Sequence, residues 1–347
     1  NIGLGAFGIS GDWSRAHPPS ASLWNTATIA FAGVTFFMTA LEILGSVNVD
    51  AMLRVRELPR AGETVHALAF DRFLGGKGAN QAVSAARSGA ELRFHACIGD
   101  DEDGEWLMSQ LQAHTVPVSN VEPVPGASSG RAYVCVDQHG ENLIVVDAGA
   151  NARLGLRGGT LEPRKVVLAQ LETPIPPTVE FFTKHRDLGA LTVLNAAPAI
   201  AEARDALFPL TDILVLNESE MAFYAGIEAL PEDVEDITTL ARALISHREQ
   251  VIVLTCGAAG ALAITWNGLD FTPARLTKVR DTTGSGDCFC GALCARLAEG
   301  DALNQAIQFA SVAASLSVER DGAASAMPAR EDIELAMFEM TAAEMPG

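Results

Sequence analysis

The second half of the chain alternates between short apolar segments and longer helical segments. The predicted strands lie within residues 165–172, 190–198, 212–220 and 250–264, and residues 233–249 carry an amphipathic helical pattern. Strands that alternate with helices form parallel sheets with helices on both faces. We therefore expect an α/β protein, a three-layer α/β/α fold with a mostly parallel central sheet.

Each of these predicted strands ends in polar or glycine-rich residues. Glu172, Asn195 and Asn217 follow the first three strands, and residues 255–260 follow the fourth. The carboxyl ends of parallel strands share one edge of the sheet, where open α/β sheets bind ligands. Because packing does not require polar groups at four successive strand ends, we expect a binding site at this edge.

The first half of the chain shows a different strand pattern. Residues 41–55 predict a buried strand that runs into a loop containing Asn48 and Asp50. Residues 62–73 and 130–149 alternate between apolar and polar side chains, as half-exposed strands do. These short strands predict a small sheet that is separate from the main core.

The charge of the chain excludes two classes of partner. The sequence has 24 basic and 43 acidic residues, a formal net charge of −19, and no basic run. Such a surface repels nucleic acid and anionic lipid, so we expect neither as a partner. An anionic substrate would need a local cation or a bound metal ion.

The six cysteines are scattered, and no C-x2-C pair occurs among them. This usage fits reduced, buried thiols rather than a disulfide framework or a zinc site. We expect a cytoplasmic protein.

Residues 1–37 do not follow the strand–helix alternation. A loop-like stretch precedes the apolar segment 27–45, and Arg15 and His17 are the basic groups before it. A signal peptide or a membrane anchor is an alternative interpretation, although this is a poor positively charged leader region. We expect an N-terminal extension outside the core, with residues 38–347 forming the folded domain.

A tight turn precedes a predicted helix in the stretch DTTGSGDCFCGAL, residues 281–293. In one interpretation the turn begins a core helix, which Asp287 caps. In the other, Gly284, Ser285 and Gly286 direct backbone N–H groups at an anion, and Asp287 is a general base beside them. This turn alone does not decide between the two.

A second glycine-rich stretch, GGKGANQA at residues 75–82, opens another predicted helix without being a P-loop. Together the two stretches resemble the two signatures of the PfkB/ribokinase family of carbohydrate kinases. The resemblance covers residues 41–334 and continues, in the family's order, at residues 45–50, 98–105, 170–172, 195–199, 216–220 and 255–260.

The resemblance implies an ATP-dependent phosphotransferase that acts on a sugar hydroxyl with Mg²⁺ bound to the phosphates. The stretch GGKGANQA is similar to that of the ribose-phosphorylating members, so D-ribose is the expected acceptor. A sibling kinase for deoxyribose, a nucleoside or fructose is one alternative. A non-catalytic sugar or nucleotide sensor is another, which the intact Asp287 and Gly286 disfavour.

The family's roles carry over to matching positions of this sequence. Asp287 would be the general base, with Gly284, Ser285 and Gly286 as the anion hole. The residues implied to hold the sugar are Asn48, Asp50, Gly76, Lys77, Gly78, Asn80, Glu172 and Asp287. The residues implied to hold ATP and Mg²⁺ are Asn217, Glu220, Thr255, Gly257, Gly260, Gly286 and Ser311.

The resemblance also implies a monovalent cation, K⁺, and a lid. The matching cation residues are Asp281, Thr283, Ser317, Arg320, Gly322 and Ala326. Ala326 departs from the family, which commonly has Ser there. Residues 50–74 and 130–147 would form a β-lid that closes over the sugar and pairs with a second subunit in a homodimer.

Overall fold

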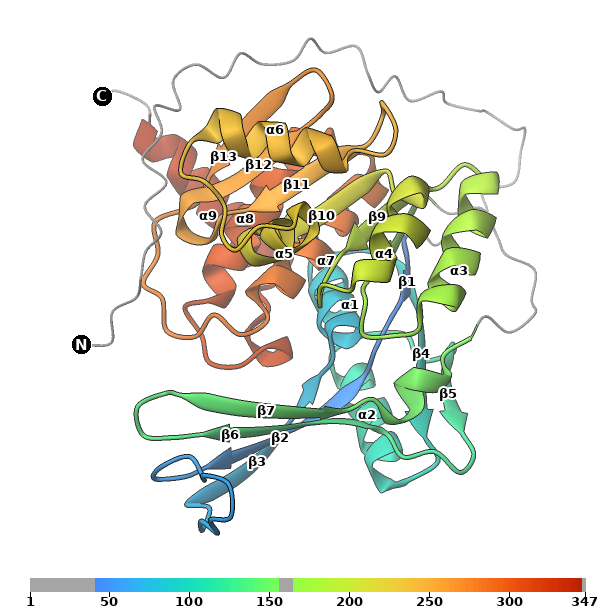
Figure 1. Cartoon of the computed structure of the whole chain (residues 1–347), viewed down its shortest axis with the longest axis vertical. Coiled ribbons are helices and arrows are strands. Elements are labelled where there is room, and N and C mark those ends of the chain that lie inside the picture. Colours follow the sequence, from blue (N-terminus) through green and yellow to red (C-terminus); the bar gives the residue numbers. More distant parts are fainter. Residues whose placement is uncertain (1–40, 156–164, 345–347) are drawn as a thin grey trace.

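The structure is a computed structural model that describes residues 41–155 and 165–344 (Figure 1). The predicted extension, residues 1–37, lies outside the described residues. All six cysteines are free thiols, and Cys135 is the one that is not fully buried. Among the described helices, none is both long enough and apolar enough to cross a bilayer.

A nine-stranded sheet runs through the main body of the described chain. Its strands are β1 (Leu41–Leu44), β4 (Leu92–Gly99), β5 (Val121–Val124), β8 (Val166–Ala169), β9 (Leu191–Asn195), β10 (Ile213–Asn217), β11 (Val251–Thr255), β12 (Gly260–Ile264) and β13 (Leu269–Pro273). Their spatial order is β13-β12-β11-β10-β9-β8-β1-β4-β5. Neighbours from β11 to β5 are parallel, and β12 and β13 extend the other edge antiparallel.

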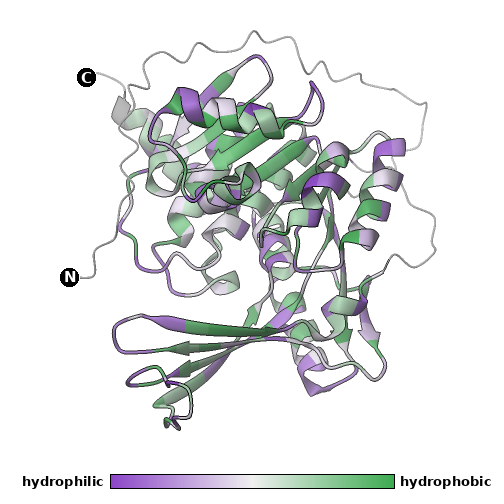
Figure 2. Ribbon diagram, in the orientation of Figure 1, coloured by the Kyte–Doolittle hydropathy of each residue, from purple (hydrophilic) through white to green (hydrophobic). Residues whose placement is uncertain are grey.

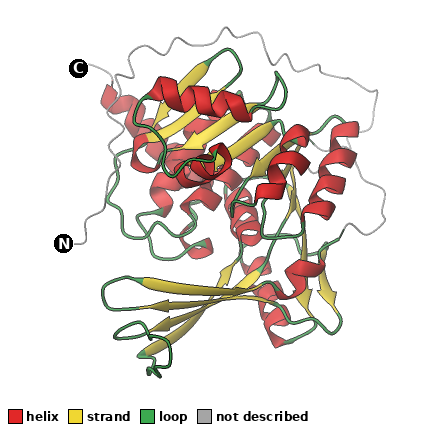
Figure 3. Ribbon diagram, in the orientation of Figure 1, coloured by secondary structure: helices red, strands yellow, loops and turns green. Residues whose placement is uncertain are grey.

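Helices cover both faces of this sheet (Figures 1 and 3). The described helices are α1 (Lys77–Arg87), α2 (Glu102–Ala113), α3 (Ile175–Asp187), α4 (Ala201–Ala206), α5 (Glu218–Ala225), α6 (Val234–Leu244), α7 (Ser285–Glu299), α8 (Leu303–Ser317) and α9 (Arg330–Glu344). Short 3₁₀ segments are η2 (Gly149–Arg153), η3 (Phe208–Leu210), η4 (Gly257–Ala259) and η5 (Ala324–Ala326).

Buried strand residues alternate between two cores, which is why the fold has three layers. Leu41 and Ile43 pack in the core formed with α1, α2, α7, α8 and α9, whereas Leu44 packs in the core formed with α3 to α6. In β8, Val166 packs in the first of these cores and Val167 in the second. Figure 2 shows these central strands as predominantly hydrophobic, as expected for a sheet buried on both faces. The predicted α/β/α fold is confirmed.

A four-stranded sheet projects from the main body, at the bottom of Figure 1. Its strands are β2 (Asn48–Arg54), β3 (Ala69–Gly75), β6 (Gly130–Val136) and β7 (Asn142–Asp147), in the order β3-β2-β6-β7. The prediction of a loop at Asn48 and Asp50 is wrong, because both residues lie in β2 and pair with strands on either side. The predicted strand at 62–73 begins only at Ala69.

Helices α1 and α7 pack against each other unusually closely. A Cβ atom on Gly291 of α7 would lie 2.4 Å from the carbonyl oxygen of Gln81 and 2.6 Å from Cβ of Ser84, both on α1. Such distances are shorter than van der Waals contact, so the glycine is required for this approach. The close approach brings the first turn of α1 beside the first turn of α7.

We predict that Gly291→Ala destabilises the protein by about 1–2 kcal/mol. An added methyl group in a tightly packed interior forces the neighbours apart at a cost of about 1–3 kcal/mol. The gain of about 1 kcal/mol that alanine brings to a helix interior offsets only part of this cost. Urea unfolding measures the difference from the unsubstituted protein. Gly155→Ala is the control, because a Cβ at Gly155 would have no atom of the described residues within 4 Å. Equal or higher stability of the Gly291 variant would contradict the packing argument.

Candidate active site

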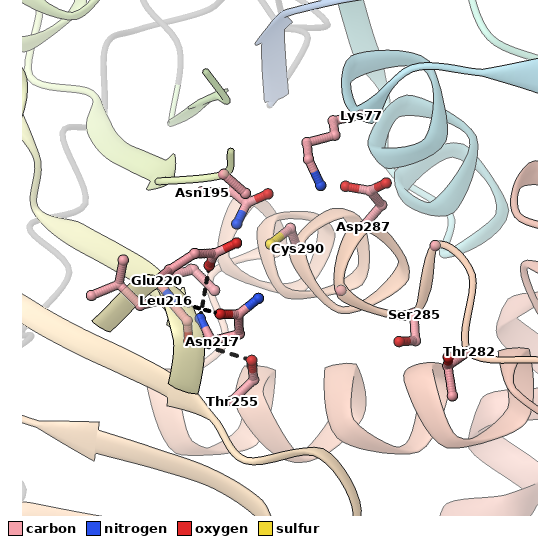
Figure 4. Close-up of a pocket in the computed structure, with 14 residues that line it drawn as sticks. Lys77, Asn195, Leu216, Asn217, Glu220, Thr255, Thr282, Ser285, Asp287 and Cys290 are labelled. Atoms are coloured by element: carbon pink, nitrogen blue, oxygen red, sulfur yellow. Dashed lines mark hydrogen bonds between the residues drawn. The ribbon is translucent and has the colours of Figure 1, made fainter. Parts of the chain in front are cut away.

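A cleft of about 180 Å³ opens at the carboxyl edge of the sheet, between the ends of β9, β10 and β11 and the starts of α1 and α7 (Figure 4). The edge of the sheet at which we expect binding therefore contains a cleft. The lining residues are Lys77, Asn195, Ala197, Val215, Leu216, Asn217, Glu220, Thr255, Thr282, Gly284, Ser285, Gly286, Asp287 and Cys290.

Asp287 lies in the first turn of α7 and is 5% exposed. Gly284, with a left-handed φ of 74°, is the N-cap of this helix, so the interpretation of Asp287 as the cap is wrong. The Asp287 carboxylate instead accepts one hydrogen bond per oxygen, from Asn80 Nδ2 (3.1 Å) and from Gln81 Nε2 (3.0 Å). Burial raises the pKa of Asp287, while the charge of Lys77 and these two amide donors act in the opposite direction.

Three further ionisable groups lie close to Asp287. The negative charge of Asp287, and to a smaller extent that of Glu172, raises the pKa of the Lys77 ammonium despite its burial. Burial, with the charges of Glu172 and Asp287, raises the pKa of Asp50 to about 7. The charge of Lys77 thus interacts with those of Asp287, Glu172 and Glu220, and the charge of Asp50 with those of Glu172 and Asp287.

Glu172 is fixed by the start of α1. Its Oε2 atom accepts hydrogen bonds from the Lys77 backbone N–H (2.9 Å) and from Ser46 Oγ (2.5 Å). Gly78 makes this junction possible, because a Cβ there would lie 2.5 Å from the Ser46 backbone nitrogen. Gly76, the N-cap of α1, has a φ of 87°, which glycine adopts readily.

Asn48 is held by a residue that the motifs do not single out. Asn151 Nδ2 donates to Asn48 Oδ1 (2.7 Å) and to the Val47 carbonyl, and Asn151 Oδ1 accepts from the Val47 N–H. Asn151 is fully buried in η2, directly after β7. This bonding ties the start of β2 to the end of β7.

Asn217 and Glu220 form a capping box at the start of α5. The Asn217 side chain accepts from the Glu220 N–H, and Glu220 Oε2 accepts from the Asn217 N–H, both at 2.8 Å. Burial raises the pKa of Glu220, opposed by the Asn217 N–H and by Lys77. The second oxygen of Glu220 is not used by this box.

The donor set fits a magnesium ion that is carried mainly by phosphate and water. Among the described residues, no group of three or more His, Cys, Asp or Glu side chains could hold a metal ion alone. Mg²⁺ in nucleotide sites commonly has one or two carboxylate partners, with substrate phosphates and waters completing the shell. Glu220 lines the cleft and can serve as such a partner.

A second, more apolar cleft of about 260 Å³ adjoins the first and shares Thr255, Thr282, Ser285 and Gly286 with it. Its remaining lining residues are Gly257, Ala258, Gly260, Ala274, Arg275, Leu276, Thr277, Val279, Phe289, Ser311, Ala314, Ser315 and Val318. Ser311 Oγ is buried and has no hydrogen-bond partner among the described residues. The cleft thus combines apolar walls with an unsatisfied hydroxyl, and small-molecule sites commonly pair an apolar lining with a few polar groups.

The residues matched to a monovalent cation lie before α7 (Asp281, Thr283), at the last residue of α8 (Ser317) and in the segment after α8 (Arg320, Gly322, Ala326). Asp281 Oδ1 accepts from the N–H and Oγ1 of Thr283, and its Oδ2 accepts from the Gly322 N–H (2.8 Å). The Asp281 carboxylate is therefore engaged by protein donors. Ala326 is buried in η5, and Arg320 pairs with Asp332 at 3.3 Å.

Gln81 is the second residue that the motifs do not single out. Its Nε2 atom donates to Asp287 Oδ1 and to Asn195 Oδ1, both at 3.0 Å. The available signal is a glutamine within the small-residue helix that GGKGANQA opens, where a buried amide must have partners. The Asn195 side chain, placed at the edge by its strand end, lines the cleft.

Comparisons with known proteins agree with this geometry. Residues 38–330 match the model of the pfkB family carbohydrate kinases. A ribokinase of Staphylococcus aureus is 34% identical over 84% of this chain and 97% of its own length. The structure of Arabidopsis thaliana ribokinase complexed with ribose and ATP has a TM-score of 0.76 and 26% identity, covering 86% of this chain and 98% of that one.

A bifunctional ribokinase/ribose-5-phosphate isomerase A of Fructilactobacillus sanfranciscensis is 35% identical over 85% of this chain. The chain spans 56% of the length of that relative. Because the family model covers residues 38–330, far more than half of the sequence, the chain belongs to the pfkB family of carbohydrate kinases.

Proposed function

We propose that this protein is an ATP-dependent ribokinase, which converts D-ribose and ATP into D-ribose 5-phosphate and ADP. The observation that carries the proposal is the placement of Asp287. Its buried carboxylate faces a cleft at the amino end of α7, beside the lysine of the helix that GGKGANQA opens. A sensor would gain nothing from a buried carboxylate with a raised pKa at this position.

Asp287 is the general base in this proposal. It takes the proton from the primary hydroxyl of the sugar as the oxygen attacks the γ-phosphorus of ATP. The backbone N–H groups of Gly284, Ser285 and Gly286, at the positive end of α7, stabilise the charge on the transferring phosphoryl group, and that of Ser285 is shared with the Thr282 carbonyl, 3.2 Å away. The base and the anion hole lie within four consecutive residues, so one helix terminus aligns both.

The sugar occupies the end of the cleft where the carboxylates gather. The residues proposed to hold its hydroxyls are Asn48, Asp50, Gly76, Lys77, Gly78, Asn80 and Glu172. Amide and carboxylate groups together can accept from and donate to every hydroxyl of a small polyol. Lys77 offsets part of the negative charge that these carboxyl groups bring.

ATP lies along the two adjoining clefts, with its base against the apolar walls near Ser311 and its phosphates toward Asn217. The proposed contacts are Asn217, Glu220, Thr255, Gly257, Gly260, Gly286 and Ser311. A bound Mg²⁺ supplies the positive charge that an acidic protein lacks at the phosphates. Free thiols throughout the chain suit a reducing compartment, so we place the enzyme in the cytoplasm.

The small sheet is proposed to be a lid and a dimer interface. Residues 38–347 would form one kinase domain, with the lid made from residues 50–74 and 130–147. The edge strand β7 presents Leu143, Ile144, Val145 and Val146, which are 45–59% exposed (Figure 2). An exposed apolar edge strand invites pairing with a second copy, and that pairing would cover it.

We predict that Asp287→Asn retains ribose binding but lowers turnover by about 10²–10⁴-fold, because the amide cannot take a proton. Coupled ADP release with Mg²⁺ and ATP measures turnover, and calorimetry measures binding. The unsubstituted protein is assayed in parallel with ribose, 2-deoxyribose, fructose and a nucleoside. If the protein phosphorylates another acceptor faster than ribose, that acceptor replaces ribose as the proposed substrate. Near-normal turnover of the variant would remove Asp287 as the base.

We predict that K⁺ activates the enzyme and that Ala326→Ser lowers the K⁺ concentration needed for half-activation. The serine would restore an oxygen that ribokinases commonly have at this position of the cation loop. Turnover is measured across a K⁺ series at constant ionic strength. Ala324→Ser, in the same buried 3₁₀ segment, is the matched control. Turnover that is independent of K⁺ in all three proteins would exclude the cation.

We predict a homodimer in sedimentation velocity at micromolar concentration. Val146→Lys should yield monomers, because a charge on β7 cannot be buried without a partner. Leu188→Lys, at an exposed apolar residue in the turn after α3, should leave the dimer intact. A monomeric unsubstituted protein, or a dimer that survives Val146→Lys, would contradict the lid-mediated interface.

A further inference from the structure

Gln81 is a fully buried side chain at the centre of a chain of amides. Its Oε1 atom accepts from Gln170 Nε2 at 2.8 Å. Its Nε2 atom donates to both Asp287 Oδ1 and Asn195 Oδ1 at 3.0 Å. The two amide hydrogens and the amide oxygen are therefore all engaged, which leaves Gln81 no contact of its own with a ligand.

The direction of these hydrogen bonds is determined by chemistry. A carboxylate can only accept, so the NH₂ end of Gln81 must face Asp287. The oxygen of Gln81 then faces Gln170, which must present its own NH₂ group. Reversing either amide would place two acceptors against each other in the dry interior, where an unpaired polar group is costly.

We propose that Gln81 is a positioning residue that orients the general base and the Asn195 amide simultaneously. Asn80 holds one oxygen of Asp287 and Gln81 holds the other, so the plane of the carboxylate cannot rotate. Each carboxylate oxygen keeps a second acceptor site, and one of these remains for the sugar hydroxyl. The inference rests on the proposed role of Asp287 as the base.

The second hydrogen bond of Gln81 determines which end of Asn195 faces the cleft. Because Asn195 Oδ1 accepts from Gln81, its NH₂ group is the free end. Figure 4 shows this nitrogen on the side of Glu220 and Asn217. Asn195 is thereby assigned as a donor to the phosphoryl group in transfer, positioned by the same amide that positions the base.

The pKa of the Asp287 carboxyl reports whether Gln81 donates a hydrogen bond to it. The ionisable groups that influence it are Lys77 on α1, Asp50 on β2, Glu172 after β8, Glu220 on α5, and Cys288 and Cys290 on α7. These groups remain when Gln81 is replaced. Removing an N–H donor from the ionised form raises the pKa of the carboxyl, so the base titrates at higher pH.

The test compares Gln81→Met with Gln81→Glu, which keeps the size of the side chain. Gln81→Met should move the acidic limb of the kcat profile upward by about one pH unit, the loss expected for one hydrogen bond to a charge. Plateau kcat should fall about 10–100-fold with little change in the KM for sugar, since the base is misaligned. Gln81→Glu should shift the limb further, because two carboxyl groups then share a proton.

Ser84→Ala is the matched control. Ser84 lies one turn further along α1 and donates to the Cys288 carbonyl at 2.7 Å, so its loss weakens the contact of α1 with α7 without touching the carboxylate. This variant should lose thermal stability and keep the pH profile. A Gln81→Met protein that likewise loses only stability would reduce Gln81 to a structural role and overturn the inference.

A second readout separates this inference from the proposed function. NMR of ¹³C-labelled aspartate, with the Asp287 signal assigned from Asp287→Asn, gives the carboxyl pKa without any substrate. An upward shift in Gln81→Met supports the inference even if no sugar is phosphorylated. An unchanged Asp287 titration overturns it even if the unsubstituted protein is an active ribokinase.

Discussion

The burial of the Asp287 carboxylate between α1 and α7 is the interaction on which the site depends. A carboxylate removed from water is destabilising unless hydrogen bonds and an opposite charge compensate for it. Asn80, Gln81 and Lys77 supply that compensation from the first turns of one helix. They reach Asp287 because Gly291 lets the two helices approach more closely than any other residue would.

The same arrangement explains how an acidic protein can accept a polyphosphate. The excess of negative charge also appears beside Asp287, where burial and the charges of Glu172 and Asp287 raise the pKa of Asp50 to about 7. The cleft itself is different, since the start of α7 and the capping-box glutamate Glu220 line it. Directed backbone dipoles and a metal ion can stabilise the negative charge of the phosphates there, as basic side chains do in other proteins.

The regular parts of the fold were predictable from the sequence because they follow from local periodicity. Alternating apolar strands and helices give the three layers, and polar strand ends give the binding edge. The loop predicted at Asn48 and Asp50 was wrong because strand pairing with β3 and β6 is a non-local property. Asn151 and Gln81 were missed for the same reason, since their importance lies in partners that are 103 and 206 positions away.

Two chain crossings between the small sheet and the main body lie against each other. Residues 45–47 join β1 to β2, and Gly76 joins β3 to α1. A Cβ on Gly76 would lie 2.9 Å from the Asn48 nitrogen and 3.0 Å from the Ser46 carbonyl oxygen. The two connections therefore lie in direct backbone contact, with no side chain between them. Because Gly76 directly precedes Lys77, the position of the small sheet is tied to the first turn of α1 and to the lysine of the cleft.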